Sequence, residues 1–242
     1  MNLCIDQGNS STKVGIFSQN KLINSLTYEQ FGKSELSAIL AKFRIGYCII
    51  SSVISDNSEL VGVLKSKIPF LIELTHETKV PIKNSYLTPE TLGRDRLAAV
   101  VGAAFLKPET DILVIDAGTA ITYDFIDSNQ NYTGGNIAPG LMLRLRALHE
   151  FTQKLPKVDP KTESPLLGNT TETAILSGSL YGIVFEIDGY IDTLKIKYPQ
   201  LSTFLTGGST FYFDTKLKNA IFAERNLVLI GLNRILLSNV QK

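Results

Sequence analysis

The chain has 242 residues, 44% hydrophobic and 19% charged, a composition typical of a globular protein rather than a disordered one. Its 24 Lys and Arg against 23 Asp and Glu give a net charge of +1, which provides no general basic surface for nucleic acid. No basic segment precedes an apolar one at the N-terminus, and the longest apolar run, 97–106, is too short to cross a bilayer. We therefore expect neither a nucleic-acid partner nor a membrane partner.

The two cysteines indicate a reducing compartment. Cys4 and Cys48 each lie in an apolar run that is typical of a strand. Two such cysteines favour buried thiols over a disulfide framework. We expect a cytoplasmic protein.

The first part of the chain predicts an α/β arrangement that begins with strands. Apolar runs bounded by Gly, Asn and Ser predict three short strands joined by turns. Helical spacing and runs of strand-forming residues then predict an alternation of helices and strands. The expected strands are 2–7, 12–17, 21–29, 46–53 and 70–75, and the expected helices are 34–43, 58–68 and 93–106.

The pattern starts again beyond residue 110. A strand, a tight turn and a strand are expected in 111–127, and residues 132–140 form the last part of a third strand. Helices are expected at 172–194 and 226–239, with a strand at 202–208 between them. The turn Asp6-Gln7-Gly8-Asn9 matches Asp116-Ala117-Gly118-Thr119, 110 residues later. This repeat predicts an internal duplication into two domains, 1–112 and 113–242, that pack closely around a cleft.

The first of these turns carries groups that bind phosphate. Gly8 allows a tight turn and the close approach of a phosphate, and nearby backbone N–H groups and hydroxyls can donate to an anion. Lys13 is a point charge suited to phosphate oxygens, and Asp6, at a strand end, can hold Mg²⁺ through water. The segment is Asp6, Gln7, Gly8, Asn9, Ser10, Ser11, Thr12 and Lys13.

A hairpin that merely faces solvent would explain one such turn, because short motifs often occur by chance. A second turn of the same build favours a different explanation, in which both turns bind the phosphates of one nucleotide. The sequence contains neither G-x-x-x-x-G-K-[ST] nor G-x-G-x-x-G, which argues against a P-loop and a Rossmann dinucleotide site. The only histidines are His76 and His149, and no Cys or His stands at metal-ligand spacing, so neither a zinc site nor a Ser-His-Asp triad is expected.

A second candidate site lies within 86–99. Gly93 opens a predicted helix, whose first N–H groups favour an anion, and Asp95 follows between Arg94 and Arg96. This cluster is either a helix cap with a local ion pair or a substrate site. In the second interpretation, Arg96 binds an anionic group of the substrate and Asp95 accepts a proton from a substrate hydroxyl.

Together these motifs make the chain resemble the type III pantothenate kinases, members of the acetate and sugar kinase, Hsp70 and actin superfamily. The resemblance spans essentially the whole chain and rests on the order and spacing of motifs that are each weak alone. Besides the first turn, the motifs are Tyr86-x-x-Pro89, Gly93 to Arg96, Asp116 to Ala120, Gly134 to Gly140, Leu155-Pro156, Gly168 to Gly178 and Thr206-Gly207-Gly208.

The resemblance implies an α/β fold of duplicated ribonuclease H-like (actin-like ATPase) domains with a nucleotide cleft between them. It also implies an enzyme that phosphorylates the primary hydroxyl of pantothenate with ATP, which forms 4'-phosphopantothenate in the first step of coenzyme A biosynthesis. ATP would be bound by Asp6 to Lys13 and by Thr119, together with Mg²⁺. Asp116 would hold a monovalent cation, K⁺ or NH₄⁺.

The resemblance further implies the roles of the second candidate site. Asp95 would be the proton acceptor, and the pantothenate site would be lined by Tyr86, Gly93, Arg94, Asp95 and Arg96. Thr171 matches the family threonine that reaches pantothenate, often in the partner subunit, although Thr170 and Thr173 are close enough to be alternatives. Adenine would lie against Thr206-Gly207-Gly208. From the sequence alone, this glycine pair is equally well explained as a simple turn at the start of a helix. A homodimer is expected, as is usual in the family.

Two positions depart from the family pattern. The residue after the first Asp is usually apolar but here is Gln7, and the usual Asn-Thr appears as Asn9-Ser10. Ser10 retains the hydroxyl, so phosphate binding should survive, and Gln7 should affect packing more than chemistry.

Two other functions stay open at this point. The fold could phosphorylate another small metabolite, because Tyr86 to Arg96 indicates an anionic acceptor without naming it. The chain could also be a non-catalytic regulator, since some relatives were described as accessory factors for transcription. An intact Asp95 and the near-neutral charge favour catalysis over that function.

Overall fold

The computed structural model describes residues 1–54 and 57–240. The chain divides into two compact units. The first contains Met1–Glu109, Asn129–Thr133 and Asn226–Lys242, and the second contains Thr110–Ser128 and Gly134–Arg225.

The sheet of the first unit has five strands in the order β3-β2-β1-β4-β5. Strands β1, β2 and β3 form an antiparallel meander, because turn residues separate three runs of strand-forming residues. Strands β4 and β5 continue the sheet in parallel with β1. The bounds are β1 Asn2–Gln7, β2 Thr12–Ser18, β3 Lys21–Tyr28, β4 Tyr47–Ser52 and β5 Phe70–Glu73.

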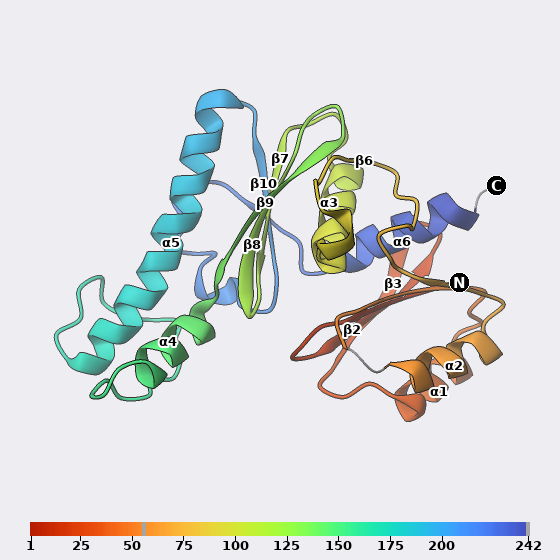
Figure 1. The fold of residues 1–242 in the computed structure, drawn as a ribbon, viewed down its shortest axis with the longest axis horizontal. Coiled ribbons are helices and arrows are strands. Elements are labelled where there is room, and N and C mark those ends of the chain that lie inside the picture. The colour runs from red at the N-terminus through yellow and green to blue at the C-terminus, as the bar shows by residue number, and fades with distance from the viewer. Residues whose placement is uncertain (55–56, 241–242) are drawn as a thin grey trace. The chain divides into compact units, whose positions relative to one another are not determined.

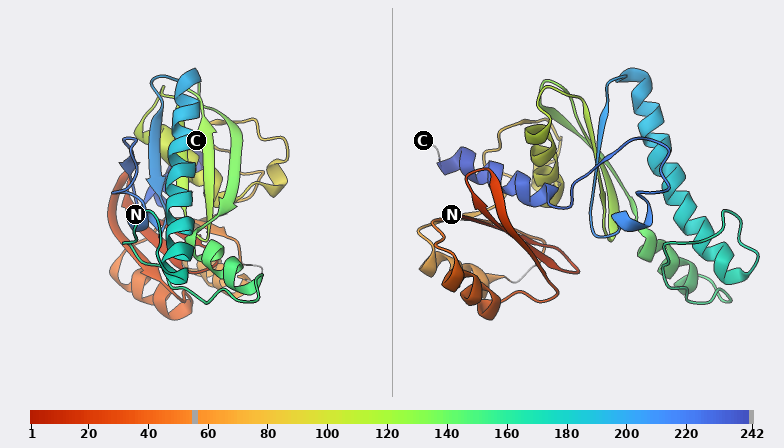
Figure 2. Two further views of the ribbon diagram at one scale, coloured as in Figure 1. Left: turned by 90° about the vertical axis from the view of Figure 1, so that its left-hand side faces the viewer. Right: turned by 180° about the vertical axis from the view of Figure 1, so that it is seen from behind.

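Helices cover both faces of this sheet (Figure 1). On one face, Leu36 of α1 and Leu64 of α2 are buried with Leu3 and Ile5 of β1. On the other face, α6 packs on β1 and β4 and against α3, so α6 lies across the sheet from α1 and α2 (Figure 2). The bounds are α1 Lys33–Lys42, α2 Ser58–Lys67, α3 Arg94–Leu106 and α6 Leu227–Val240.

Helices α3 and α6 approach closely because each has a glycine at the contact. A Cβ atom added at Gly102 would clash with the backbone carbonyl of Leu227, and one added at Gly231 would clash with that of Ala98. Small residues at a helix crossing allow the two backbones to come together, which fixes α6 on α3.

The two cysteines are free and buried, as predicted. Leu3, not Cys4, is the register partner of Cys48 on the neighbouring strand, so the two thiols point to opposite faces of the sheet. Burial raises the pKa of both thiols, which keeps them protonated and unreactive.

The second unit repeats the strand arrangement of the first. Its sheet has the strand order β6-β9-β8-β7-β10-β11, in which β9-β8-β7-β10-β11 corresponds to β3-β2-β1-β4-β5. Strands β1 and β7 begin 110 residues apart and share one burial pattern along their length. The predicted duplication is confirmed. The bounds are β7 Ile112–Ala117, β8 Ala120–Ile126, β9 Asn131–Pro139, β10 Ser202–Thr206 and β11 Phe222–Ala223.

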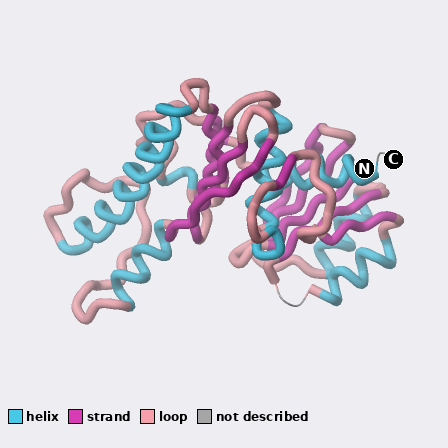
Figure 3. Tube along the Cα trace, turned by 45° about the horizontal axis from the view of Figure 1, so that its top comes forward, coloured by secondary structure: helices cyan, strands magenta, loops and turns pink. Residues whose placement is uncertain are grey.

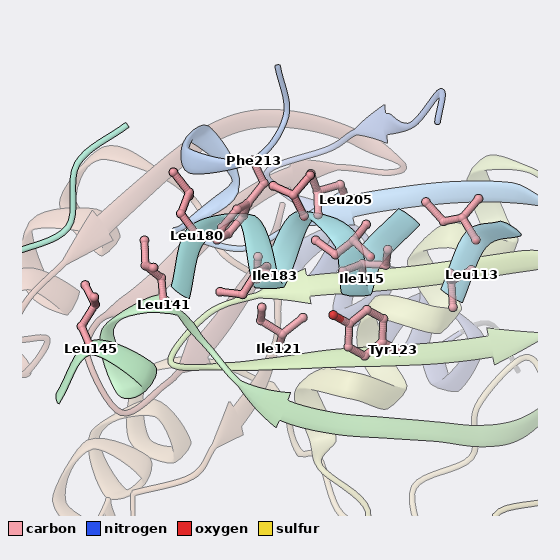
Figure 4. Close-up of a cluster of buried hydrophobic side chains, with 14 of the residues drawn as sticks. Leu113, Ile115, Ile121, Tyr123, Leu141, Leu145, Leu180, Ile183, Leu205 and Phe213 are labelled. Carbon is pink, nitrogen blue, oxygen red and sulfur yellow. The ribbon is translucent and has the colours of Figure 1, made fainter. Parts of the chain in front are cut away.

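The core of the second unit lies between its sheet and α5, Thr171–Lys197, which runs along the strands (Figures 1 and 2). This helix is long and apolar enough to cross a membrane by length and composition. Most of its apolar residues instead line the core, where helical spacing brings them onto the sheet. Figure 4 shows Leu180 and Ile183 of α5 beside Ile115, Ile121 and Tyr123 of the strands.

Several short elements lie outside the sequence prediction. Helix α4, Leu141–Glu150, begins after Gly140 and buries Leu141 and Leu145, which stand one helical turn apart. Residues 151–170, between α4 and α5, contain no helix or strand (Figure 3). The remaining elements are the two-residue strand β6 Lys83–Asn84 and the 3₁₀ turns Pro89–Thr91 and Thr210–Tyr212.

The units differ from the two contiguous halves, 1–112 and 113–242, that the sequence suggests. The first unit ends at Glu109 and takes in both 129–133 and α6. A sequence repeat shows where a pattern restarts, but the sheet on which the last helix packs depends on tertiary contacts.

The α3–α6 contact generates the first prediction. We expect Gly231→Ala to lower the free energy of unfolding by about 1–3 kcal/mol, because the new methyl group overpacks a backbone contact. Gly189→Ala in α5 is the matched control, since a Cβ there meets nothing within 4 Å, and should be neutral or stabilising by up to about 1 kcal/mol. Urea unfolding of both variants measures the difference. Equal stability of the two variants would contradict the close contact.

Candidate active site

The first hairpin turn closes between the ends of β1 and β2. Gln7 pairs with Thr12, and the N–H of Gly8 donates to the carbonyl of Ser11 at 3.0 Å. Asp6 and Lys13 are the next cross-strand pair, and both project from the face opposite the α1–α2 core. The ammonium of Lys13 has no partner in the described part of the chain, so it is available to an anion.

Gln7 is buried, as its place on the strand requires, and only 5% of it is exposed. Its backbone carbonyl accepts from the N–H of Val53 at 3.1 Å, which ties β1 to the segment after β4. Its side-chain Oε1 has no hydrogen-bond partner among the described residues. The side chain therefore belongs to the interior of the sheet end, which agrees with the expectation that it affects packing.

The start of α3 presents Asp95. Gly93 is the N-cap, and Asp95 Oδ1 accepts from the N–H of Arg96 at 2.8 Å. The other carboxylate oxygen has no hydrogen-bond partner in the described residues, so it can accept one from a ligand. A Cβ at position 93 would lie 2.7 Å from Asp95 Oδ1, so the glycine at this position leaves room for the Asp95 carboxylate.

Arg94 connects this helix to the sheet. Its Nη1 donates to the carbonyl of Ser52 at 3.1 Å, and Ser52 ends β4 in register with Gln7 of β1. The first hairpin and the start of α3 are therefore brought to the same edge of the first unit's sheet. Sequence spacing alone does not predict this link, because 42 residues separate Arg94 from Ser52.

Tyr86 and Arg96 also come together within the first unit. The guanidinium carbon of Arg96 lies 5.7 Å from the centre of the Tyr86 ring. The Tyr86 ring also stacks on the ring of Tyr132, with 6.2 Å between the ring centroids and 7° between the ring planes. Tyr132 is fully buried, so it holds the Tyr86 ring in place. The sequence gives no sign of this role, since Tyr132 becomes a neighbour only through the pairing of β6 with β9.

The second hairpin turn has the same build with one residue fewer. Ala117 pairs with Ile121, and the N–H of Gly118 donates to the carbonyl of Ala120 at 3.0 Å. Asp116 is half-buried and Thr119 is exposed at the tip. Both turns thus place an acidic residue one position before the last residue of the central strand.

Two glycines from other segments hold the second turn. The N–H of Gly140 donates to the carbonyl of Thr119 at 3.0 Å, and a Cβ there would clash with the turn backbone. Gly207 has φ +101°, a conformation that favours glycine, and a Cβ there would lie 2.5 Å from both Asp116 Oδ1 and the carbonyl of Ala117. The motifs Gly134 to Gly140 and Thr206 to Gly208 therefore pack on the second turn.

A polar cluster braces the end of β9. Arg144 Nη2 donates to Glu186 Oε2 at 2.6 Å, and Arg144 Nε donates to the carbonyl of Pro139 at 2.8 Å. The hydroxyl of Tyr123 donates to Glu186 Oε1 at 2.7 Å. Burial and the bond to Glu186 raise the pKa of Tyr123, so it stays a donor. Because Pro139 precedes Gly140, this cluster fixes the segment that supports the second turn.

The three threonines at the start of α5 differ in their hydrogen bonds. Thr170 is the N-cap: its Oγ1 accepts from the N–H of Thr173 at 3.2 Å, and Thr173 Oγ1 accepts from the N–H of Thr170 at 2.9 Å. The side chain of Thr171 is exposed and makes no hydrogen bond in the described residues. Two of the three hydroxyls thus cap the helix, and Thr171 is the one left for a ligand.

The fold and its paired turns define a class of protein. A ROK family glucokinase of Streptomyces griseus, solved with glucose and AMPPNP, matches 98% of this chain and 99% of its own, with a TM-score of 0.53 and 10% identity. A conserved protein of Campylobacter jejuni assigned to the Baf family of transcriptional activators matches 99% and 100%, with a TM-score of 0.62 and 24% identity. The chain has the duplicated ribonuclease H-like fold of the actin-like ATPases and sugar kinases, as predicted.

Sequence similarity identifies the family. The model of the type III pantothenate kinases matches residues 2–193. The type III pantothenate kinase of Phocaeicola vulgatus is 52% identical over 240 residues, which cover 99% of each chain. That of Bacteroides fragilis strain YCH46 is 50% identical over 237 residues, which cover 98% of this chain and 97% of the relative. The chain belongs to the type III pantothenate kinase family, and the resemblance seen in its motifs is confirmed.

Proposed function

We propose that the chain phosphorylates pantothenate with ATP, which yields 4'-phosphopantothenate in the first step of coenzyme A biosynthesis, and that Asp95 is the proton acceptor. Membership of the family supports the reaction. The observation that carries the role of Asp95 is its geometry: one carboxylate oxygen is held by the N–H of Arg96, and the other has no partner among the described residues. A base needs such an oriented, available oxygen.

The ATP phosphates are bound by the first hairpin, Asp6 to Lys13, and by Thr119 of the second. The backbone turn at Gly8 and the available ammonium of Lys13 support the first assignment. The exposed position of Thr119 at the tip of a turn held by Gly140 supports the second. The adenosine lies against the backbone of Thr206 to Gly208, the segment that packs on that turn.

Pantothenate carries a carboxylate and a primary hydroxyl, and the site at the start of α3 offers a partner for each. Arg96, held against Tyr86, supplies positive charge for the carboxylate. Gly93 and Arg94 complete the lining, and Arg94 is fixed by its bond to Ser52. The exposed hydroxyl of Thr171 donates to pantothenate, as its lack of a capping role allows.

Two cations complete the proposal. Asp6 suits Mg²⁺ bound through water, and Asp116 suits a monovalent cation, K⁺ or NH₄⁺, because hard cations take oxygen ligands. The surroundings of Asp116 fit a cation, since the buried hydroxyl of Thr206 on the adjacent strand has no hydrogen-bond partner in the described residues. When bound, such cations neutralise charge on the phosphates.

The transfer itself needs positioning and charge neutralisation more than covalent help. The pantothenate hydroxyl oxygen forms a bond to the γ-phosphorus, and the bond from that phosphorus to the β–γ bridging oxygen breaks, which releases ADP. Asp95 takes the hydroxyl proton. Arg96 and Tyr86 hold the acceptor, and Lys13 holds the donor.

The first test replaces the base. We expect Asp95→Asn to lower kcat by roughly 10²–10⁴-fold while ATP affinity stays close to wild type, because the amide keeps the shape but cannot take a proton. Asp214→Asn is a matched control, because Asp214 Oδ1 likewise accepts from the next N–H at 2.8 Å. A coupled assay of ADP release and calorimetric titration of AMPPNP measure the two effects. A wild-type turnover rate in Asp95→Asn would contradict the role of Asp95 as the proton acceptor.

The second test removes the lysine ammonium that is proposed to bind the ATP phosphates. We expect Lys13→Ala to weaken AMPPNP binding roughly tenfold or more and pantothenate binding much less, because a charge-assisted bond to phosphate is worth about 1.5–3 kcal/mol. Lys21→Ala, at the exposed start of β3, is the control and should bind both ligands as wild type does. Calorimetric titrations report both affinities, and unchanged AMPPNP affinity would contradict the role of Lys13.

We further propose a cytoplasmic homodimer formed through the second unit. Large apolar side chains stay exposed on α4, on the segment that follows it and on α5, which favours a protein partner. A second copy is the expected partner, because Thr171 begins α5 and the family resemblance implies a threonine that reaches the partner's substrate. The exposed apolar residues are Met142, Leu143, Leu148, Phe151, Leu166, Leu167 and Phe185.

The assembly has its own test. Phe185, which is 61% exposed in the single chain, is the natural target on α5. We expect Phe185→Lys to shift the sedimenting species from dimer to monomer, because a charge would be buried at the contact. Ile23→Lys, an exposed apolar residue on β3 of the first unit, is the control and should leave the dimer intact. If the wild-type protein sediments as a monomer, the proposed homodimer is wrong.

A further inference from the structure

We propose that the hydroxyl of Thr206 is a ligand of the monovalent cation at Asp116, a role that rests on the cation site proposed above. Thr206 is the last residue of β10 and is 1% exposed. Its Oγ1 is buried and has no hydrogen-bond partner among the described residues. A buried hydroxyl without a partner is costly and uncommon, and beside a carboxylate it is placed to bind a cation.

Strand register brings this hydroxyl to Asp116. Strands β7 and β10 pair in parallel, with Thr206 directly opposite Asp116. Leu205 and Ala117, the neighbours of this pair, point into the core with α5. Because side chains alternate along a strand, Thr206 and Asp116 both point to the other face, side by side.

The carboxylate of Asp116 also leans toward the end of β10. A Cβ placed on Gly207 would lie 2.5 Å from Asp116 Oδ1, so this oxygen sits over the residue that follows Thr206. The positive φ of Gly207, +101°, is the conformation that leaves room for it. An anionic oxygen and a neutral hydroxyl oxygen therefore converge at one end of two adjacent strands.

This donor set suits a singly charged cation. One carboxylate with a neutral oxygen balances a single positive charge, and neither oxygen is a thiolate or an imidazole of the kind that selects a transition metal. Across residues 1–54 and 57–240, no group of three or more His, Cys, Asp or Glu side chains is placed to hold a metal. The remaining ligands would be phosphate or water oxygens.

The chain contains a matched control on the same strand. Thr203 Oγ1 is likewise buried without a partner in the described residues, and Thr203 is 2% exposed. It stands an even number of residues from Leu205, so it points toward the core and away from Asp116. Thr203→Val and Thr206→Val thus remove equivalent hydroxyls from opposite faces of β10.

The experiment measures cation binding directly. Thermal unfolding of the full chain with Mg²⁺ and AMPPNP is followed while KCl replaces choline chloride at constant ionic strength. We expect Thr206→Val to raise the K⁺ concentration at half-maximal stabilisation by about tenfold or more, because a ligand of a charged group is lost. Thr206→Ser should stay within about threefold of wild type, and Thr203→Val should match wild type.

The outcomes separate this inference from the proposed reaction. In choline chloride without nucleotide, Thr206→Val should be as stable as wild type, because it loses only an unpaired hydroxyl. An unchanged K⁺ response in Thr206→Val, or an equal loss of AMPPNP affinity with and without K⁺, overturns the role of Thr206. A wild-type chain that phosphorylates pantothenate with no K⁺ response overturns the cation site as well, and leaves the kinase function standing.

Discussion

Parallel pairing of β1 with β4, and of β7 with β10, is the constraint on which the candidate site depends. In the first unit it sets Gln7 beside Ser52, and Arg94 then binds the carbonyl of Ser52. In the second unit the same pairing sets Asp116 beside Thr206. Because parallel strands end at the same edge, segments far apart in the sequence deliver their polar ends to one place.

Glycine makes that edge possible in both units. Gly93 leaves room for the Asp95 carboxylate, and Gly140 and Gly207 let two segments pack on the second turn. At Gly140 and Gly207 a side chain would meet the backbone of the second turn, and at Gly93 it would displace the carboxylate of Asp95. The glycines of these motifs therefore act mainly by allowing close approach, and the polar residues beside them are the ones that we propose carry the chemistry.

Much of the candidate site could be proposed from the sequence, because its residues are local in the sequence. The turn from Asp6 to Lys13 and the segment from Gly93 to Arg96 are each contiguous, so residue type and order indicate their chemistry. Tyr132 and Thr206 were harder to assign. The first becomes a neighbour of Tyr86 through the pairing of β6 with β9, and the second becomes a neighbour of Asp116 through the pairing of β7 with β10.

The sequence by itself determined most of the elements, the duplication and the family, because these follow from periodicity, from the spacing of repeated turns and from motif order. Only the tertiary structure decided that the last helix packs in the first unit, that Thr170 and Thr173 are occupied by a helix cap, and that one hydroxyl on β10 is buried without a partner. The physical reason is that packing and hydrogen-bond satisfaction depend on residues that the folded chain alone makes neighbours.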